Sequence, residues 1–118
     1  MLIVVEDDDG VRVLVEELLL DRGYNVITAQ TGAEGLDRIQ REPRLFLVIT
    51  DIRMPGMSGL ELQSKLNSDH CLIPTIFITA HGVEKMRLQA MRGGAVKFLA
   101  KPFDGETLLD AVRVALQR

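Results

Sequence analysis

The chain has 118 residues, enough for one domain with a single buried core. Acidic residues outnumber basic ones by 17 to 14, and the net charge of -3 excludes an electrostatic basis for direct nucleic-acid binding. No apolar run approaches the roughly 20 residues that cross a bilayer, and no signal-peptide pattern opens the chain. We therefore expect a cytoplasmic protein without a membrane segment, and the single cysteine, which forms no internal disulfide, agrees with a reducing cytosol.

Five short apolar runs alternate with helical patterns along the chain. Several runs are apolar at nearly every position, which is typical of parallel strands that are covered on both faces. The predicted strands are 2–6, 25–29, 45–50, 75–80 and 96–100.

The first two helices follow the first two strands. Apolar residues at i, i+3, i+4, i+7 and i+8 spacing predict a first helix that ends before Gly23. The second helix is expected near 32–41, before Pro43. The buried stripe of the first helix is predicted to contain Val11, Leu14, Val15, Leu18 and Leu19.

The last three helices carry recognisable start and stop signals. Ser58 and Glu61 have the spacing of a capping box, so the third helix begins at Ser58. The fourth helix is expected around 83–92, before two glycines, and Asp104 is the expected N-cap of the fifth. The apolar stripe of the fifth helix is predicted to contain Leu108, Leu109, Val112, Ala115 and Leu116.

Strict alternation of strand and helix predicts a (βα)5 protein, a doubly wound, flavodoxin-like α/β sandwich. Right-handed crossovers favour a parallel five-stranded sheet with the order 2-1-3-4-5. A ligand site in such a sheet lies at the carboxyl ends of strands 1 and 3, where the direction of winding switches.

Polar and charged side chains follow the strands at that edge. Strand 1 runs into the acidic stretch 6–9, strand 3 into Asp51, strand 4 into Thr79 and strand 5 into Lys101. Carboxylates that converge repel one another at neutral pH, so the arrangement needs a cation. A ligand set of oxygens without His or Cys favours Mg²⁺ or Mn²⁺ and disfavours zinc.

Lys101 and Thr79 suit an anion rather than a metal ion, because an ammonium and a hydroxyl both donate to phosphate oxygens. The edge therefore offers what phosphoryl transfer requires, with Asp51 as the acceptor. Each residue also has a simpler explanation: Asp8 and Asp9 can cap the first helix, and the other three can be ordinary strand-end residues. Those explanations do not account for four strand ends that suit one reaction.

The chain resembles the receiver domain of bacterial two-component response regulators over essentially its full length, residues 1–118. The stretches that carry the resemblance are VVEDDDGVR, LVITDIRMPGMSGLEL, IPTIFITAH and GGAVKFLAKPF. The C-terminal part is most similar to receivers that are fused to helix-turn-helix regions of the LuxR or nitrogen-fixation-regulator kind. We expect a single receiver domain with no output domain inside this chain. It is either a stand-alone regulator or, as we favour, a domain taken from a longer regulator.

The resemblance implies an acceptor and a metal site. Asp51 is then the phosphorylation site, and Mg²⁺ is held by Glu6, Asp7, Asp51 and the backbone carbonyl of Arg53. The acidic pair is Glu-Asp where Asp-Asp is more frequent, which lengthens one arm of the site.

The resemblance also assigns a switch. Thr79 would bind the phosphoryl group and reorient, Lys101 would pair with that group, and Phe98, at a position where tyrosine is frequent, would follow Thr79. Arg53 and His81 occupy the positions that tune phosphate lifetime, and the peptide bond before Pro102 is expected to be cis.

The implied partners are a sensor histidine kinase or a phosphotransfer protein, docked on the first helix and the loop after strand 5, where Arg12, Val13 and 16–17 would set identity. The surface of helix 4, strand 5 and helix 5 would change on phosphorylation. The changed surface would then form a homodimer or act on a DNA-binding output domain outside the chain. We expect self-phosphorylation and slow self-dephosphorylation but no turnover of an external substrate.

Three other classes of protein compete with this interpretation. A haloacid-dehalogenase-like phosphatase needs a second acid two residues after the nucleophile, where this chain has Arg53. A flavodoxin-like cofactor carrier needs a phosphate-cradling loop after strand 1, where this chain has four acids. A receiver that keeps the fold and acts as a constitutive interaction module is disfavoured because every catalytic position is filled.

Overall fold

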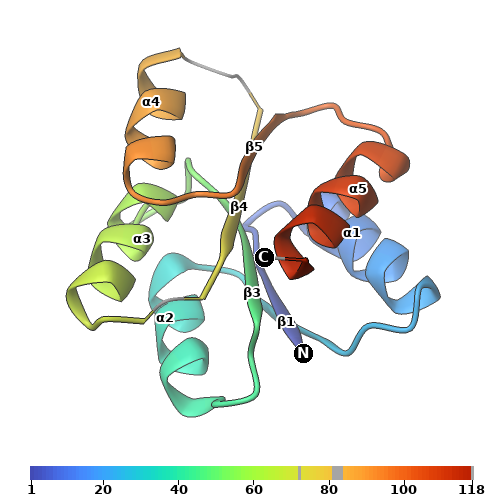
Figure 1. Cartoon of the computed structure of the whole chain (residues 1–118), viewed down its shortest axis with the longest axis horizontal. Coiled ribbons are helices and arrows are strands. Elements are labelled where there is room, and N and C mark those ends of the chain that lie inside the picture. Colours follow the sequence, from blue (N-terminus) through green and yellow to red (C-terminus); the bar gives the residue numbers. More distant parts are fainter. Residues whose placement is uncertain (72, 81–83, 118) are drawn as a thin grey trace.

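Strands and helices alternate along the chain as predicted (Figure 1). The structure, a computed structural model, describes residues 1–71, 73–80 and 84–117. The elements are β1 (Leu2–Val5), α1 (Asp9–Asp21), β2 (Val26–Ala29), α2 (Gly32–Arg41), β3 (Leu47–Asp51), α3 (Gly59–Ser68), β4 (Thr75–Thr79), α4 (Glu84–Arg92), β5 (Lys97–Ala100) and α5 (Gly105–Leu116).

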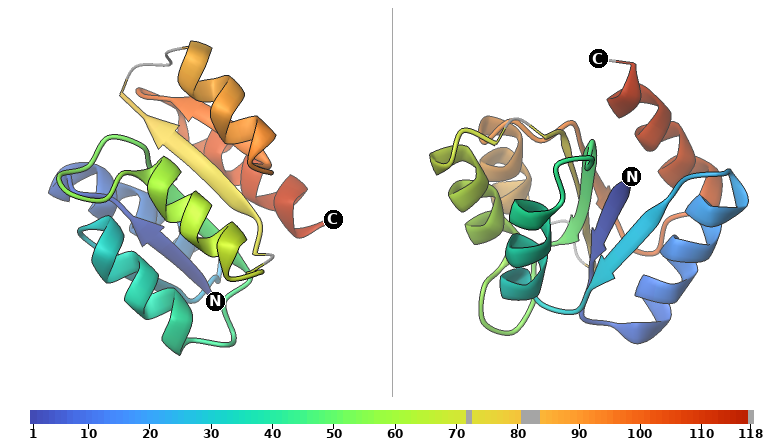
Figure 2. Two further views of the ribbon diagram at one scale, coloured as in Figure 1. Left: turned by 90° about the vertical axis from the view of Figure 1, so that its left-hand side faces the viewer. Right: turned by 90° about the horizontal axis from the view of Figure 1, so that it is seen from below.

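The five strands form one parallel sheet with the order β2-β1-β3-β4-β5, which confirms the predicted winding. Helices α1 and α5 cover one face of the sheet, and α2, α3 and α4 cover the other (Figures 1 and 2). β1 and β3 lie side by side at the centre, so their carboxyl ends open on the same edge of the sheet. None of the helices in the described part of the chain has the length and apolar character needed to cross a bilayer.

The central strands are buried on both faces, which explains their continuous apolar sequence. Alternate residues of each strand enter two separate apolar layers. Leu2, Val4, Leu47 and Ile49 face α1 and α5, whereas Ile3, Val5 and Val48 face α2 and α3. The sheet is thereby fixed between both helical layers, and the strand ends that carry the polar residues have defined positions.

The predicted helix signals are confirmed where they fall in described residues. Ser58 and Glu61 form the reciprocal capping box of α3, and Asp104 caps α5 by accepting from Thr107 N–H. Asp8 is the N-cap of α1, so Asp9 lies in the first turn instead. The β3 strand begins two residues later than predicted and includes Asp51 as its last residue.

Two residues of the predicted stripes are not buried. Leu14 is 52% exposed because it lies on the flank of α1, beside Pro102 and Phe103 of the loop after β5. Leu116 is 37% exposed in the final turn of α5. The remaining residues of both stripes are buried or half-buried, so both helices pack on the expected side.

Candidate functional site

Four strand ends bring their polar side chains to one edge of the sheet. Glu6 directly follows β1, Asp51 ends β3, Thr79 ends β4 and Lys101 directly follows β5. The strand register sets Val5 beside Thr50, so Glu6 and Asp51 are next to each other. Glu6 and Thr79 are fully buried and Asp51 is 5% exposed, so water contributes little to their solvation.

Lys101 joins two of these carboxylates. Its Nζ atom lies 2.6 Å from Glu6 Oε1 and donates to Asp51 Oδ2 at 3.0 Å. The contact with Glu6 is a close, buried ion pair. Burial disfavours the ammonium, but the two carboxylates outweigh burial and raise the pKa of Lys101.

Glu6 is a fully buried acid whose charged form is disfavoured by its surroundings. Burial raises the pKa of Glu6 to about 7, and the neighbouring Asp51 charge adds to the increase. Lys101 and the backbone N–H of Asp8, which donates to Glu6 Oε2 at 3.2 Å, act in the opposite direction. One lysine does not fully compensate the buried acids, so a second cation at this edge would favour the charged form of Glu6.

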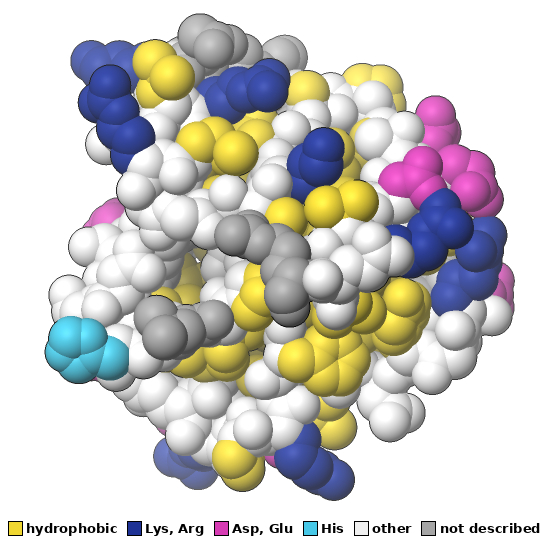
Figure 3. Space-filling view, viewed as in Figure 1, with side chains coloured by type: hydrophobic (Ala, Val, Ile, Leu, Met, Phe, Trp, Pro, Cys, Tyr) yellow, Lys and Arg dark blue, Asp and Glu magenta, His cyan; other side chains and the backbone are white. Residues whose placement is uncertain are grey.

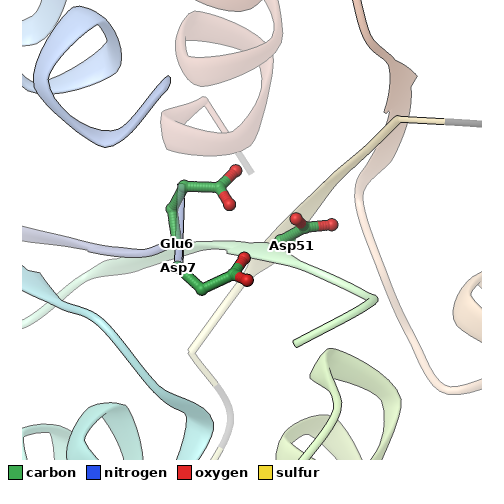
Figure 4. Close-up of side chains that lie close together, drawn as sticks. All are labelled: Glu6, Asp7 and Asp51. Carbon is green, nitrogen blue, oxygen red and sulfur yellow. The ribbon is translucent and has the colours of Figure 1, made fainter. Parts of the chain in front are cut away.

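The carboxylates of Glu6, Asp7 and Asp51 could hold such a cation. One oxygen of each lies within 4.8 Å of the other two, and Figure 4 shows the three side chains gathered at the same edge. Asp7 is exposed while the other two are buried, so the cluster opens toward solvent on one side. Three hard oxygen donors without His or Cys fit Mg²⁺.

The loop after β3 is folded tightly back on Asp51. The backbone N–H of Arg53 donates to Asp51 Oδ1 at 3.3 Å, while the Arg53 side chain is exposed. Gly59 N–H donates to Ile52 O at 2.8 Å, and a Cβ atom at Gly59 would lie 2.1 Å from the backbone oxygen of Asp51. Only glycine therefore fits at position 59 without a backbone shift.

Arg12 is a site residue whose role sequence reasoning missed. Its Nη1 donates to the backbone carbonyl of Glu6 at 3.0 Å, its Nη2 pairs with Asp9, and its side chain is 12% exposed. The available signal was the position of Arg12 one turn into α1, on the helix face next to the acidic loop.

The predicted switch residues lie in two different environments. The Thr79 hydroxyl oxygen is buried and makes no hydrogen bond within the described part of the chain. Phe98 is half-buried and packs on the cluster of Ile52 and Phe77, one strand away. His81 lies outside the described residues. The Lys101–Pro102 bond is cis, as the resemblance predicted.

The comparisons with known proteins define the class. The chain belongs to the response regulator receiver domain family, whose model matches residues 2–113. It is 43% identical over 115 residues to nodulation protein W of Bradyrhizobium diazoefficiens, covering 98% of this chain and 50% of that protein. It is 40% identical to the transcriptional regulatory protein FixJ of Azorhizobium caulinodans, covering 98% of this chain and 54% of that protein. The chain thus spans about half the length of these curated relatives.

Solved structures agree with the family. The FixJ-N crystal structure has a TM-score of 0.90 and 33% identity, covering 99% of this chain and 93% of that chain. The response regulator StyR has a TM-score of 0.89 and 42% identity, covering 98% of this chain and 58% of that chain. Receiver domains are regulatory signalling domains of two-component systems, and several relatives of this chain are transcriptional regulators.

Proposed function

We propose that this chain is a phosphorylation-dependent switch in which Asp51 accepts a phosphoryl group from a histidine kinase or a phosphotransfer protein. One observation carries the proposal. The Lys101 ammonium lies 2.6 Å from the Glu6 carboxylate and 3.0 Å from the Asp51 carboxylate, at the edge of the sheet where the acidic cluster opens to solvent.

The proposed reaction is a displacement at phosphorus. A carboxylate oxygen of Asp51 bonds to the phosphorus of a phosphohistidine, the P–N bond breaks, and the imidazole nitrogen keeps the electron pair and takes a proton from water. Lys101 offsets the charge that builds up on the phosphoryl oxygens. The buried Thr79 hydroxyl, which has no hydrogen-bond partner among the described residues, donates to one of those oxygens.

Mg²⁺, when bound, would supply the positive charge that lets a carboxylate and a phosphoryl group approach each other. Glu6, Asp7 and Asp51 would hold it through carboxylate oxygens, together with the backbone carbonyl of Arg53. The high pKa of Glu6 supports a cation at this position, because a cation favours the charged carboxylate. We further propose that Arg53, and His81 outside the described residues, tune the lifetime of the phosphate.

Helix α4, strand β5 and helix α5 are the proposed readout surface. Thr79 pairs with Ala100 across β4 and β5, and Phe98 packs under α4, so a movement of the Thr79 side chain has a short path to this surface. Lysine and arginine side chains gather over α4 in Figure 3, and Leu88 and Met91 are 50% and 42% exposed. A basic surface with exposed apolar side chains suits homodimerisation or an output contact after activation.

The proposed kinase contact is the hollow between α1 and the loop after β5. This hollow of about 410 Å³ is lined mainly by apolar groups, among them Leu14, Pro102 and Phe103. It lies beside Lys101, which also lines it, so a partner that docks there is adjacent to the acceptor. Val13 and the acids 16–17 of α1 remain the residues proposed to set kinase identity. Arg12 is no longer among them, because its side chain donates to the Glu6 carbonyl.

Residues 1–118 are proposed to act as one cytoplasmic receiver unit that turns over no external substrate. Several relatives are named as transcriptional regulators and are about two to four times as long as this chain. The proposed output is therefore transcription, through a DNA-binding region outside residues 1–118.

A small phosphodonor tests the proposal directly. Incubation with acetyl phosphate or phosphoramidate and Mg²⁺ is expected to add one phosphoryl group, measured by intact mass. Asp51→Asn is expected to abolish the gain, and EDTA to suppress it in the unchanged chain. A mass that stays constant with Mg²⁺ present, or an equal gain in Asp51→Asn, would overturn the proposal.

A further inference from the structure

The first residue of α2 touches the loop that follows the acceptor strand. Gly32 is buried, and a Cβ atom at this position would lie 2.6 Å from the backbone oxygen of Met57 and 2.9 Å from its Cβ atom. Both distances are shorter than real Cβ contacts, and the nearer atom belongs to the backbone. The start of α2 and the peptide of Met57 are therefore in direct contact, with no room for a side chain between them.

The loop that contains Met57 is closed at its base by a backbone hydrogen bond. Gly59 N–H donates to Ile52 O at 2.8 Å and closes the loop at its base. Inside the loop, Arg53 N–H donates to Asp51 Oδ1. Met57 and Arg53 thus lie four residues apart in one short closed loop, so we expect a displacement of Met57 to reach the peptide of Arg53.

Helix α2 is also packed closely against the sheet. Its first turn is ordered by Thr31, which caps the helix by accepting from Glu34 N–H at 3.1 Å. One turn later, a Cβ atom at Gly35 would lie 2.7 Å from the Val5 side chain, so the helix already touches β1. Because the helix is already in contact with β1, we expect the loop to absorb most of the strain from a side chain at position 32.

We propose that Gly32 is a positioning residue for the metal site, acting through Met57 on the peptide of Arg53. This proposal rests on the proposed function, in which the Arg53 carbonyl is a ligand of Mg²⁺. Helix α2 carries none of the side chains that form the acidic cluster, yet its first turn sets the position of the loop that completes it.

The test is Gly32→Ala, with Gly105→Ala as the matched control. Both glycines directly follow an N-cap residue and begin a helix, and alanine favours a helix more than glycine does. At Gly105 the nearest atom to an added Cβ is Leu18 Cδ2 at 3.1 Å, which is the end of a flexible side chain. Leu18 lies near the C-terminal end of α1, whereas the acidic loop precedes the N-terminal end of that helix. The two variants thus make the same chemical change, one against the loop backbone and one away from it.

Two measurements are made on each variant. Calorimetric titration with Mg²⁺ alone is expected to give a dissociation constant about tenfold higher in Gly32→Ala and unchanged in Gly105→Ala, as for other residues that orient a ligand. Amide NMR shifts without metal are expected to change across residues 51–59 in Gly32→Ala only.

The outcomes separate this proposal from the proposed function. Equal Mg²⁺ affinity and equal loop shifts in the two variants would overturn the positioning role, even if the unchanged chain gains a phosphoryl group. A chain that binds Mg²⁺ but accepts no phosphoryl group would overturn phosphorylation and leave the positioning role intact.

If circular dichroism shows that Gly32→Ala does not fold, Met57→Ala is used instead, because it removes the Met57 side chain beyond Cβ from the contact with Gly32. Met57→Ala is expected to raise the dissociation constant for Mg²⁺ by less than the tenfold expected for Gly32→Ala. A dissociation constant equal to that of the unchanged chain would overturn the proposal.

Discussion

At the scale of single residues, Lys101 holds together two carboxylates that would otherwise repel each other. Glu6 is fully buried, Asp51 nearly so, and the Lys101 side chain is 16% exposed. Without metal, Lys101→Met is expected to lower the free energy of unfolding by about 2 kcal/mol, less than for a fully enclosed pair because Lys101 keeps some solvent. Urea unfolding in EDTA, followed by circular dichroism, measures the change.

Lys97→Met is the matched control for Lys101→Met. Lys97 is exposed on β5, so its replacement is expected to change stability by no more than about 0.5 kcal/mol. Added Mg²⁺ is expected to restore part of the stability of Lys101→Met, because a bound cation stabilises the folded state. Equal stability of the two variants in EDTA would contradict the bridging role of Lys101.

Gly59 fixes the backbone beneath Asp51, the proposed acceptor. In Gly59→Ala the added Cβ atom would lie 2.1 Å from the backbone oxygen of Asp51, so β3 or the loop must shift. We expect the free energy of unfolding to fall by about 3 kcal/mol, at the upper end of overpacking costs. Thermal unfolding beside Gly105→Ala measures the difference, and a Gly59→Ala variant as stable as that control would show that the loop has room.

At the scale of elements, the C-terminal end of α4 is tied to α3. Gln63 Nε2 donates to Ala90 O at 2.9 Å, and Asn67 Nδ2 donates to Gly93 O at 3.0 Å. The same Ala90 carbonyl accepts from Ala95 N–H, and Gly94 N–H donates to Met91 O, which is the bonding of a Schellman motif. Two amides of α3 thus complete the cap of the neighbouring helix.

Gln63→Leu removes one of these bonds without changing the side-chain size greatly. We expect the free energy of unfolding to fall by about 1 kcal/mol and amide exchange at 93–96 to become faster, because the end of α4 then keeps its own cap and only one of the two bonds from α3. Hydrogen exchange measured by NMR checks this locally. Gln89→Leu, at an exposed glutamine of α4, is the control. Unchanged exchange at Ala95 in Gln63→Leu would refute the link between the helices.

The start of α5 makes part of the stability depend on pH. Hydrogen bonds from the backbone N–H and the hydroxyl of Thr107 lower the pKa of Asp104 below its usual value of 3.8. A lowered folded-state pKa gives stability that is complete above the unfolded pKa and is lost as pH falls through the folded pKa. In Asp104→Asn, the amide oxygen of the new side chain would cap the helix without titrating. The stability of the unchanged chain relative to this variant is therefore expected to fall below about pH 4.

Urea unfolding of both proteins between about pH 6 and pH 3 checks the Asp104 prediction. The quantity to compare is the difference between their free energies of unfolding, since the other carboxylates titrate equally in both. A difference that stays constant over this range would contradict the prediction.

At the scale of the whole molecule, the fold followed from the sequence because topology and burial depend on patterns that a sequence contains. Strands covered on both faces are continuously apolar, and parallel strands joined by helices place all carboxyl ends on one edge. This rule alone predicts that Glu6, Asp51, Thr79 and Lys101 lie at the same edge of the sheet.

Side-chain partners did not follow, because they depend on rotamers and on small differences in packing. Lys101 was expected beside a phosphoryl group, and its contact with Glu6 was not foreseen. Gln63 flanks an apolar stripe, and nothing in its spacing shows that it reaches a carbonyl of α4. Leu14 has core spacing but lies beyond the edge of the α1 contact with the sheet.

The proposed switch must connect Asp51 to a distant surface, and Thr79 is the proposed connection. Beryllium trifluoride with Mg²⁺ imitates the phosphoryl group, and it is expected to shift amide NMR signals at the site, in β5 and in α4. In Thr79→Ala we expect the shifts near Asp51 to persist and those of α4 and Phe98 to shrink, because the hydroxyl that follows the phosphoryl group is gone. Thr75→Ala is the control, since Thr75 is a buried threonine at the other end of the same strand. If Thr79→Ala keeps the full response in α4, the signal reaches that helix by a route that does not involve the hydroxyl.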